Sequence, residues 1–258
     1  MIQKYNMSKP LKSCSVLGLP VHVMANYPNW LLERISLGEG THVVTLNAEM
    51  TMQAEQNKSL ADVISNAELV IPDGAGVVLY LQLFLRQDVQ RIPGIELSEA
   101  LLQSMGESGS NAKVFFYGGG LGVAQKAADY WQSQAPGLKF AGIHSGYHSK
   151  VEEEQLKQTL AEIQPEVILV GLGVPRQEAW IAQNRHLCPN AIWIGVGGSF
   201  DIWSGMKSRA PAWLGNNNLE WLYRLYQEPW RWRRMLALPE FAAKCIVYSA
   251  TGKGTITQ

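Results

Sequence analysis

The sequence predicts a doubly wound α/β fold, in which a mostly parallel, Rossmann-like sheet is followed by a helical C-terminal appendage. Two observations favour this fold class. Short apolar and β-branched runs alternate with helical patterns along the chain, as in parallel strands joined by crossover helices. With 258 residues and 47% hydrophobic content, the chain is also long enough to bury the large core that such a sheet requires.

Six segments have the composition of buried parallel strands, since each is a short apolar run rich in β-branched or aromatic residues. Segments with helix-like patterns separate them. In chain order, the predicted strands are 42–46 (HVVTL), 69–71 (LVI), 113–117 (KVFFY), 139–143 (KFAGI), 167–170 (VILV) and 191–196 (AIWIGV). The predicted helices are 57–66, 97–106, 123–134, 151–163 and 177–183.

The strand pattern stops near residue 205, and arginine and tryptophan then become frequent. We therefore predict a catalytic core over 1–205 and an appendage over 206–258. Within the appendage, 209–234 combines arginines, which bind phosphate bidentately, with tryptophans, which favour surfaces that are part apolar and part wet. This combination suits a ligand with a diphosphate head and an apolar tail. The alternative is an exposed helix whose tryptophans fill a core and whose arginines are solvated.

Overall composition argues against several classes of protein. The 22 basic and 22 acidic residues cancel, which disfavours a nucleic-acid-binding role. Cys14, Cys188 and Cys245 are isolated, so their spacing indicates neither a zinc site nor a disulfide framework. The first residues lack the apolar stretch of a signal peptide, and no run of about 18 apolar residues follows. We expect a cytoplasmic chain that lies on a membrane rather than spanning it.

Each predicted strand ends in a polar or glycine-rich loop. Because the carboxyl ends of parallel strands meet at one edge of a sheet, these loops predict a ligand crevice there. Asp73 follows the second strand in a PDGAG turn, where a carboxylate could act as a general base. Thr45 and Asn47 end the first strand and offer a hydroxyl and an amide to a sugar or nucleotide. A plain turn at Asp73, and local backbone hydrogen bonds at Thr45 and Asn47, are the alternatives.

Two further loops have features of ligand-binding sites. Gly118 and Gly119 lie between a strand and a helix start, where bare backbone and a helix N-terminus can hold phosphate, although a tight turn has the same composition. Gln177 and Glu178 follow the fifth strand in GVPRQE and could bind sugar hydroxyls. Alternatively, Glu178 could interact with the helix dipole or pair with Arg176. Arg91, in the RIPG turn, is a candidate anion contact unless it is a solvated surface arginine.

Two other kinds of site find little support in the sequence. His144 and His148 are four residues apart, but Gly-Tyr interrupts the helical pattern between them and no acidic third ligand is fixed nearby. We therefore predict no metal site. The chain also lacks the GxSxG elbow of serine hydrolases and the GxGxxG fingerprint of dinucleotide-binding enzymes.

Taken together, the motifs resemble those of one family. TLNAEM, PDGAG, RIPG, FFYGGG, VGLGVPRQE, GVGGSFD, RAPAW and LEWLYRLYQEP occur in the order and with the approximate spacing of the WecG/TagA/CpsF family of bacterial glycosyltransferases, over about residues 15 to 235. The resemblance implies an inverting transfer from a UDP-sugar, typically UDP-N-acetylmannosamine or its uronic acid. The implied acceptor is undecaprenyl-diphosphate-linked N-acetylglucosamine at the cytoplasmic membrane face, and no metal cofactor is implied.

The resemblance also implies roles for single residues. Asp73 matches the family's proposed base and Thr45 its active-site threonine, while Asn47 lies in the same motif. Arg91 and Gln177 match an arginine and a glutamine of the family's site. The appendage arginines that match phosphate-binding positions are Arg224, Arg231 and Arg234.

Departures from the family pattern leave the sugar open. Glu96 stands where an aspartate is usual, and His148 stands where an aromatic residue is frequent. These departures do not affect the reaction type. Two alternatives to the implied function stay open, namely another UDP-hexose donor on the same scaffold and a non-catalytic module that binds nucleotide or lipid. Because an exposed tryptophan-rich segment needs a covering surface, we also expect contact with a membrane and allow for self-association.

Overall fold

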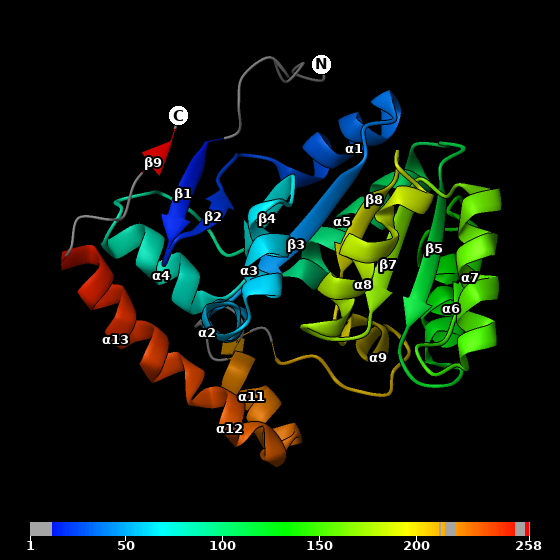
Figure 1. Ribbon diagram of the computed structural model, residues 1–258. Coiled ribbons are helices and arrows are strands. Elements are labelled where there is room, and N and C mark those ends of the chain that lie inside the picture. Colours follow the sequence, from blue (N-terminus) through cyan, green and yellow to red (C-terminus); the bar gives the residue numbers. More distant parts are fainter. Residues whose placement is uncertain (1–11, 212, 215–219, 251–255, 258) are drawn as a thin grey trace.

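A six-stranded parallel sheet forms the centre of the protein. The computed structural model describes residues 12–211, 213–214, 220–250 and 256–257. The strand order is β4-β3-β8-β7-β5-β6, and every neighbouring pair is parallel (Figure 1). The strands are β3 (Thr41–Leu46), β4 (Leu69–Pro72), β5 (Lys113–Gly118), β6 (Lys139–His144), β7 (Val167–Gly171) and β8 (Ile192–Gly195). All six predicted strands are present, so the predicted fold class is confirmed.

Helices cover both faces of this sheet, and the strands are therefore apolar on both sides. Along β5, Val114 and Phe116 pack in the core beneath one helical layer, whereas Phe115 and Tyr117 pack beneath the other. The first layer contains α1 (Tyr27–Leu37), α5 (Gly94–Glu107), α6 (Val123–Gln134) and α9 (Ser199–Trp203). The second contains α2 (Ala48–Gln56), α3 (Lys58–Ser65), α4 (Ala75–Leu83), α7 (Lys150–Ile163), α8 (Arg176–Asn184) and the 3-10 turn η1 (Arg185–Leu187).

The five predicted helices correspond to α3, α5, α6, α7 and α8, and α6 has the predicted bounds. Four other helices, α1, α2, α4 and α9, were not predicted. Two of these carry recognisable start signals, because Asn26 caps α1 and Asn47 caps α2 with their side-chain oxygens. In contrast, α4 is apolar on all sides, so its sequence lacks the periodicity that identifies a surface helix.

A second, smaller sheet was also not predicted. It is antiparallel and has the order β2-β1-β9, from β1 (Ser13–Val16), β2 (Leu19–His22) and β9 (Ile256–Thr257). Strands this short give weak sequence patterns, and the pairing of β1 with β9 joins opposite ends of the chain. The sheet therefore ties the C-terminal segment back to the core (Figure 1).

The C-terminal segment, which starts at residue 206, is mainly helical, as predicted. It contains α11 (Glu220–Gln227), the 3-10 turn η2 (Pro229–Arg231), α12 (Trp232–Met235) and α13 (Ala237–Ala250). Helix α13 lies beside α2 and α4 (Figure 1). Its Phe241 and Cys245 are buried in the same apolar cluster as residues of β1, α2 and α4, so this helix contributes to the core. In the described parts of the chain, none of the helices combines the length and the apolar character needed to cross a bilayer.

Candidate active site

A cavity of about 450 Å³ opens at the carboxyl edge of the parallel sheet. Its walls come from the ends of β3 and β4 on one side and from the loops after β7 and β8 on the other, and the C-terminal segment covers it. After β3 the chain turns to the face that carries α2, whereas after β8 it turns to the face that carries α9. Open α/β sheets bind ligands at the point where the loops after two adjacent strands leave to opposite faces. The cavity lies at such a point, between β3 and β8.

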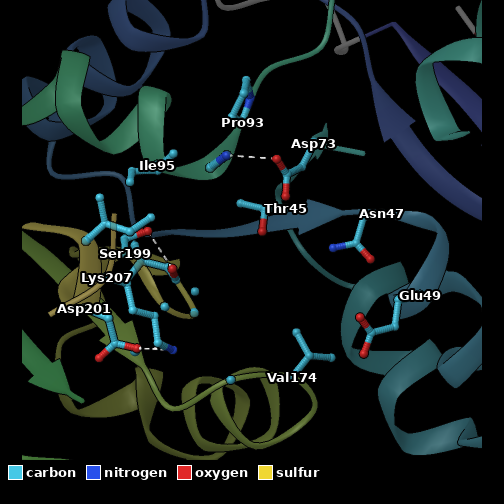
Figure 2. A pocket seen from close by; sticks show the side chains of 18 of the residues that line it. Thr45, Asn47, Glu49, Asp73, Pro93, Ile95, Val174, Ser199, Asp201 and Lys207 are labelled. Carbon is cyan, nitrogen blue, oxygen red and sulfur yellow. Dashed lines mark hydrogen bonds and ion pairs between the residues drawn. The ribbon is translucent and has the colours of Figure 1, made fainter. Parts of the chain in front are cut away.

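Asp73 lies in this cavity, directly after β4. Its backbone N–H donates to the carbonyl oxygen of Leu46 at 3.0 Å, which fixes the loop against the end of β3. The backbone N–H of Gly94, at the start of α5, donates to Oδ1 of Asp73 at 3.2 Å. This bond helps to orient the carboxylate, and the side chain faces the cavity (Figure 2).

Thr45 and Asn47 line the same wall. Thr45 is 7% exposed and packs against Gly94, where a Cβ atom would lie 2.7 Å from Cγ2 of Thr45. Gly94 therefore contacts both Thr45 and Asp73. Asn47 caps α2 by accepting the N–H of Met50 at 3.0 Å, and its amide nitrogen is on the cavity side (Figure 2). The sequence-based expectation that these three strand-end residues share one crevice is met.

Gln177 also lines the cavity, on the opposite wall. Its Oε1 accepts the backbone N–H groups of Gly173 at 3.1 Å and Gly197 at 3.0 Å. These two glycines belong to the loops after β7 and β8. A single buried side chain therefore connects the two loops.

Four other predicted contacts are not among the residues that line the cavity. Gly118 and Gly119 adopt positive φ angles of 134° and 69°, and Gly119 donates its N–H to Gly171, so they form the tight strand-to-helix turn. Arg91 is half-buried and lies two residues before Pro93, which does line the cavity. Glu178 is fully buried against His42, behind Gln177.

Positive charge reaches the cavity from the C-terminal segment, through Lys207, Arg209 and Arg234. We call these three residues the cavity cations. Arg234 was predicted, and its Nε lies 3.5 Å from Oε1 of Glu49 on α2. The backbones of Arg224 and Arg231 belong to α11 and η2, but their side chains lie outside the described part of the structure.

The other two cavity cations, Lys207 and Arg209, were not predicted. Nζ of Lys207 is 2.8 Å from Oδ2 of Asp201 on α9 and 3.0 Å from Oε1 of Glu228. Burial alone would lower the pKa of Lys207, but the hydrogen bonds to these two carboxylates outweigh it, so the pKa lies above its usual value. Arg209 pairs with Glu96 and with Glu99, both on α5. The RAPAW motif contains Arg209 and could have identified it, whereas no motif contains Lys207.

His144 and His148 lie close together outside the cavity, with ring centroids 5.4 Å apart. Nε2 of His148 is 2.7 Å from the hydroxyl of Tyr117, and Nδ1 of His144 is 2.9 Å from the carbonyl oxygen of Ser145. Within the described residues, no three His, Cys, Asp or Glu side chains gather in a way that could hold a metal ion. His144 is thus held by a neighbouring residue of its own loop, and His148 by a tyrosine on β5.

Comparison with known proteins identifies the family of this chain. A model of the glycosyl transferase WecG/TagA/CpsF family matches residues 14–254. Two similar proteins are both named N-acetylglucosaminyldiphosphoundecaprenol N-acetyl-beta-D-mannosaminyltransferase. The one from Bacillus subtilis is 37% identical over 204 residues, which cover 79% of this chain and 78% of that protein. The one from Bacillus spizizenii is 37% identical over 203 residues, which cover 79% of this chain and 77% of that protein. The chain belongs to the WecG/TagA/CpsF family of glycosyl transferases.

Proposed function

We propose that this protein transfers N-acetylmannosamine from a UDP-sugar to undecaprenyl-diphosphate-linked N-acetylglucosamine, in the synthesis of a cell-envelope polysaccharide. The names of the two Bacillus relatives state this transfer and this acceptor. The observation that carries the proposal is that Asp73 and three cations line one cavity. Asp73 stands on one side, and the three cavity cations stand at the segment that covers it.

Asp73 is the proposed general base. In an inverting transfer, the acceptor hydroxyl attacks the anomeric carbon while the bond to the UDP oxygen breaks. The hydroxyl proton passes to the Asp73 carboxylate, which accepts a hydrogen bond from the Gly94 N–H. The Thr45 hydroxyl lies on the same wall and can orient the reacting sugars by hydrogen bonding.

The cavity cations are proposed to stabilise the departing UDP. As the glycosidic bond to the donor breaks, negative charge accumulates on the β-phosphate. Lys207, Arg209 and Arg234 bring three positive charges to this cavity, and guanidinium groups can bind phosphate oxygens in pairs. Each of the three pairs with a carboxylate of the protein. Arg224 and Arg231 stay predictions for the same role.

The lipid part of the acceptor is proposed to leave the cavity along the C-terminal segment. Trp230 lines the cavity and is 71% exposed, and Trp232 on α12 is also exposed. Exposed tryptophans favour the boundary between water and lipid. We therefore propose that the protein works at the cytoplasmic membrane face with this segment on the bilayer surface.

A donor screen tests the proposal. Purified protein is incubated with a short-chain prenyl-diphosphate N-acetylglucosamine and, in separate reactions, with UDP-N-acetylmannosamine, its uronic acid or UDP-glucose, and released UDP is measured. We expect acceptor-dependent UDP release with UDP-N-acetylmannosamine and a product with the inverted, β anomeric configuration. Release with UDP-glucose alone would favour another donor on the same scaffold. Tight UDP binding without release from any donor would favour a non-catalytic binding module.

A further inference from the structure

Glu178 is a buried carboxylate that the proposed chemistry does not use. It lies in the first turn of α8, and its side chain is completely shielded from solvent. A carboxylate removed from water carries a large desolvation cost unless polar partners surround it. Two partners are present, because Nε2 of His42 lies 2.9 Å from Oε2 and Nε2 of Gln177 donates to Oε1 at 3.1 Å.

The bond from Gln177 decides how its amide group is oriented. A glutamine side chain could be turned end for end, and its NH2 group would then face the N–H donors of Gly173 and Gly197. Because Oε1 of Glu178 accepts the N–H of Gln177, Glu178 keeps the nitrogen of Gln177 on its own side. The oxygen of Gln177 is thereby directed at the two glycine N–H groups, both of which belong to loops that line the cavity.

The surroundings leave this arrangement little freedom. A Cβ atom on Gly195 would lie 2.3 Å from Nε2 of Gln177 and 2.6 Å from Oε1 of Glu178, so both side chains rest directly on the backbone of β8. On the other side, His42 belongs to β3, and its side chain is 2% exposed. The hydrogen bonds therefore run without interruption from β3, through α8, to the loops after β7 and β8.

We propose that His42 and Glu178 are positioning residues for glycosyl transfer. They do not touch the substrates, and they act through Gln177, which connects the Gly173 and Gly197 loops. Their contribution is to keep these loops at the separation that the nucleotide diphosphate of the donor requires. The inference rests on the proposed function, because it assigns a role to the wall of the same cavity.

Two substitutions at one position separate this role from simple packing. Glu178→Met has a similar length but lacks the carboxylate oxygen that accepts the N–H of Gln177. The Gln177 amide is then no longer held in one orientation, and UDP affinity should fall about tenfold. Glu178→Gln keeps an acceptor for Gln177, and His42 can then accept the new N–H through its other tautomer. We expect its UDP affinity to stay within about threefold of the wild-type value. Calorimetric titration with UDP measures both.

Glu153→Met is the matched control. Glu153 is another carboxylate that accepts a hydrogen bond from α8, but its donor is the indole N–H of Trp180. This variant should bind UDP like the wild-type protein. Equal UDP affinity in Glu178→Met and Glu178→Gln, or an equal loss in the Glu153 control, would overturn the proposal.

Substitutions at His42 test the proposal if Glu178→Met does not fold. His42→Gln places an amide nitrogen near the position of Nε2 and keeps a donor for Glu178, whereas His42→Leu removes it. We expect UDP affinity to be retained in the first variant and lowered in the second, with thermal unfolding recorded to confirm that both are folded. Wild-type affinity in a folded His42→Leu protein would contradict the role of His42.

Titration of the wild-type protein with UDP distinguishes failure of this inference from failure of the proposed function. Wild-type protein that does not bind UDP would overturn the UDP-sugar donor and the positioning role together. Wild-type protein that binds UDP, beside variants that bind it equally well, would overturn the positioning role alone.

Discussion

The backbone N–H of Gly94 donates a hydrogen bond to Oδ1 of Asp73 at 3.2 Å. The same glycine packs against Thr45, because it has no Cβ atom to hold the two apart. The first residue of α5 thus orients the proposed base and contacts the threonine beside it. This relationship connects the fold to the proposed chemistry, since α5 lies in one helical layer while Asp73 and Thr45 end two strands of the sheet.

Gly94→Ala should damage catalysis through this contact. Its added Cβ would lie 2.7 Å from Cγ2 of Thr45, so Thr45 or the start of α5 must move. Such overpacking costs about 1–3 kcal/mol of unfolding free energy. A shift of about 1 Å in the site lowers turnover by about 10²-fold. Urea unfolding and the steady-state rate of UDP release measure the two effects.

Gly120→Ala is the matched control for this change. Gly120 lies outside the cavity, and an added Cβ would meet only Val123, at 3.4 Å. This variant should keep both its stability and its rate. A Gly94→Ala protein as active as the control would show that the spacing of Thr45 and Asp73 does not matter for transfer.

Arg234→Ala should lose activity without losing the fold. The arginine side chain is 52% exposed and its pairing with Glu49 is 3.5 Å long, so its loss should change the unfolding free energy by less than about 1 kcal/mol. Removing a group that stabilises the departing diphosphate should lower kcat by about 10²–10³-fold. The measurements are the steady-state rate and the thermal unfolding of the purified variant.

The neighbouring arginine supplies the comparison. Arg233 stacks on the ring of Trp232, with its guanidinium carbon 5.5 Å from the ring centroid, and is not among the residues that line the cavity. Arg233→Ala should therefore retain most of the activity. If both variants lost activity equally, the effect would belong to the charge of the segment rather than to a contact of Arg234.

Phe241→Ala tests whether the C-terminal segment is part of the core. Phe241 is 3% exposed and packs in the apolar cluster that contains residues of α2 and α4. Its truncation should lower the unfolding free energy by about 3–5 kcal/mol. Ile246→Ala, on the same helix but 61% exposed, should change it by less than about 0.5 kcal/mol. Equal, small effects in urea unfolding would mean that α13 packs only loosely on the core.

The sequence was sufficient to predict the six strands of the parallel sheet and one wall of the cavity, for a physical reason. Strands buried on both faces are apolar throughout, and their carboxyl ends must meet at one edge. Asp73, Thr45 and Asn47 each follow or end such a strand, so the topology alone brings them together. Their roles in transfer stay predictions.

Contacts between distant segments could not be predicted in this way. One partner of Glu178 is His42, which is 136 residues away, so the local motif could not show that this carboxylate is buried against β3 rather than facing the cavity. Lys207 is held at the cavity by Asp201 on α9 and by Glu228, which precedes η2. No local sequence pattern indicates these ion pairs. At Gly118 and Gly119, a tight turn and a phosphate site require the same residues, so composition could not separate them.

The kinetics of Asp73→Asn test the central claim most directly. The amide keeps the size of the side chain and can still accept the Gly94 N–H, but it cannot take up the acceptor proton. We predict that UDP affinity is unchanged while turnover with UDP-N-acetylmannosamine and lipid-linked N-acetylglucosamine falls by about 10²–10⁴-fold. Asp88→Asn, the same change at an exposed position outside the cavity, should retain the wild-type rate. A rate for Asp73→Asn close to that of the wild-type protein would contradict the role of Asp73 as the base.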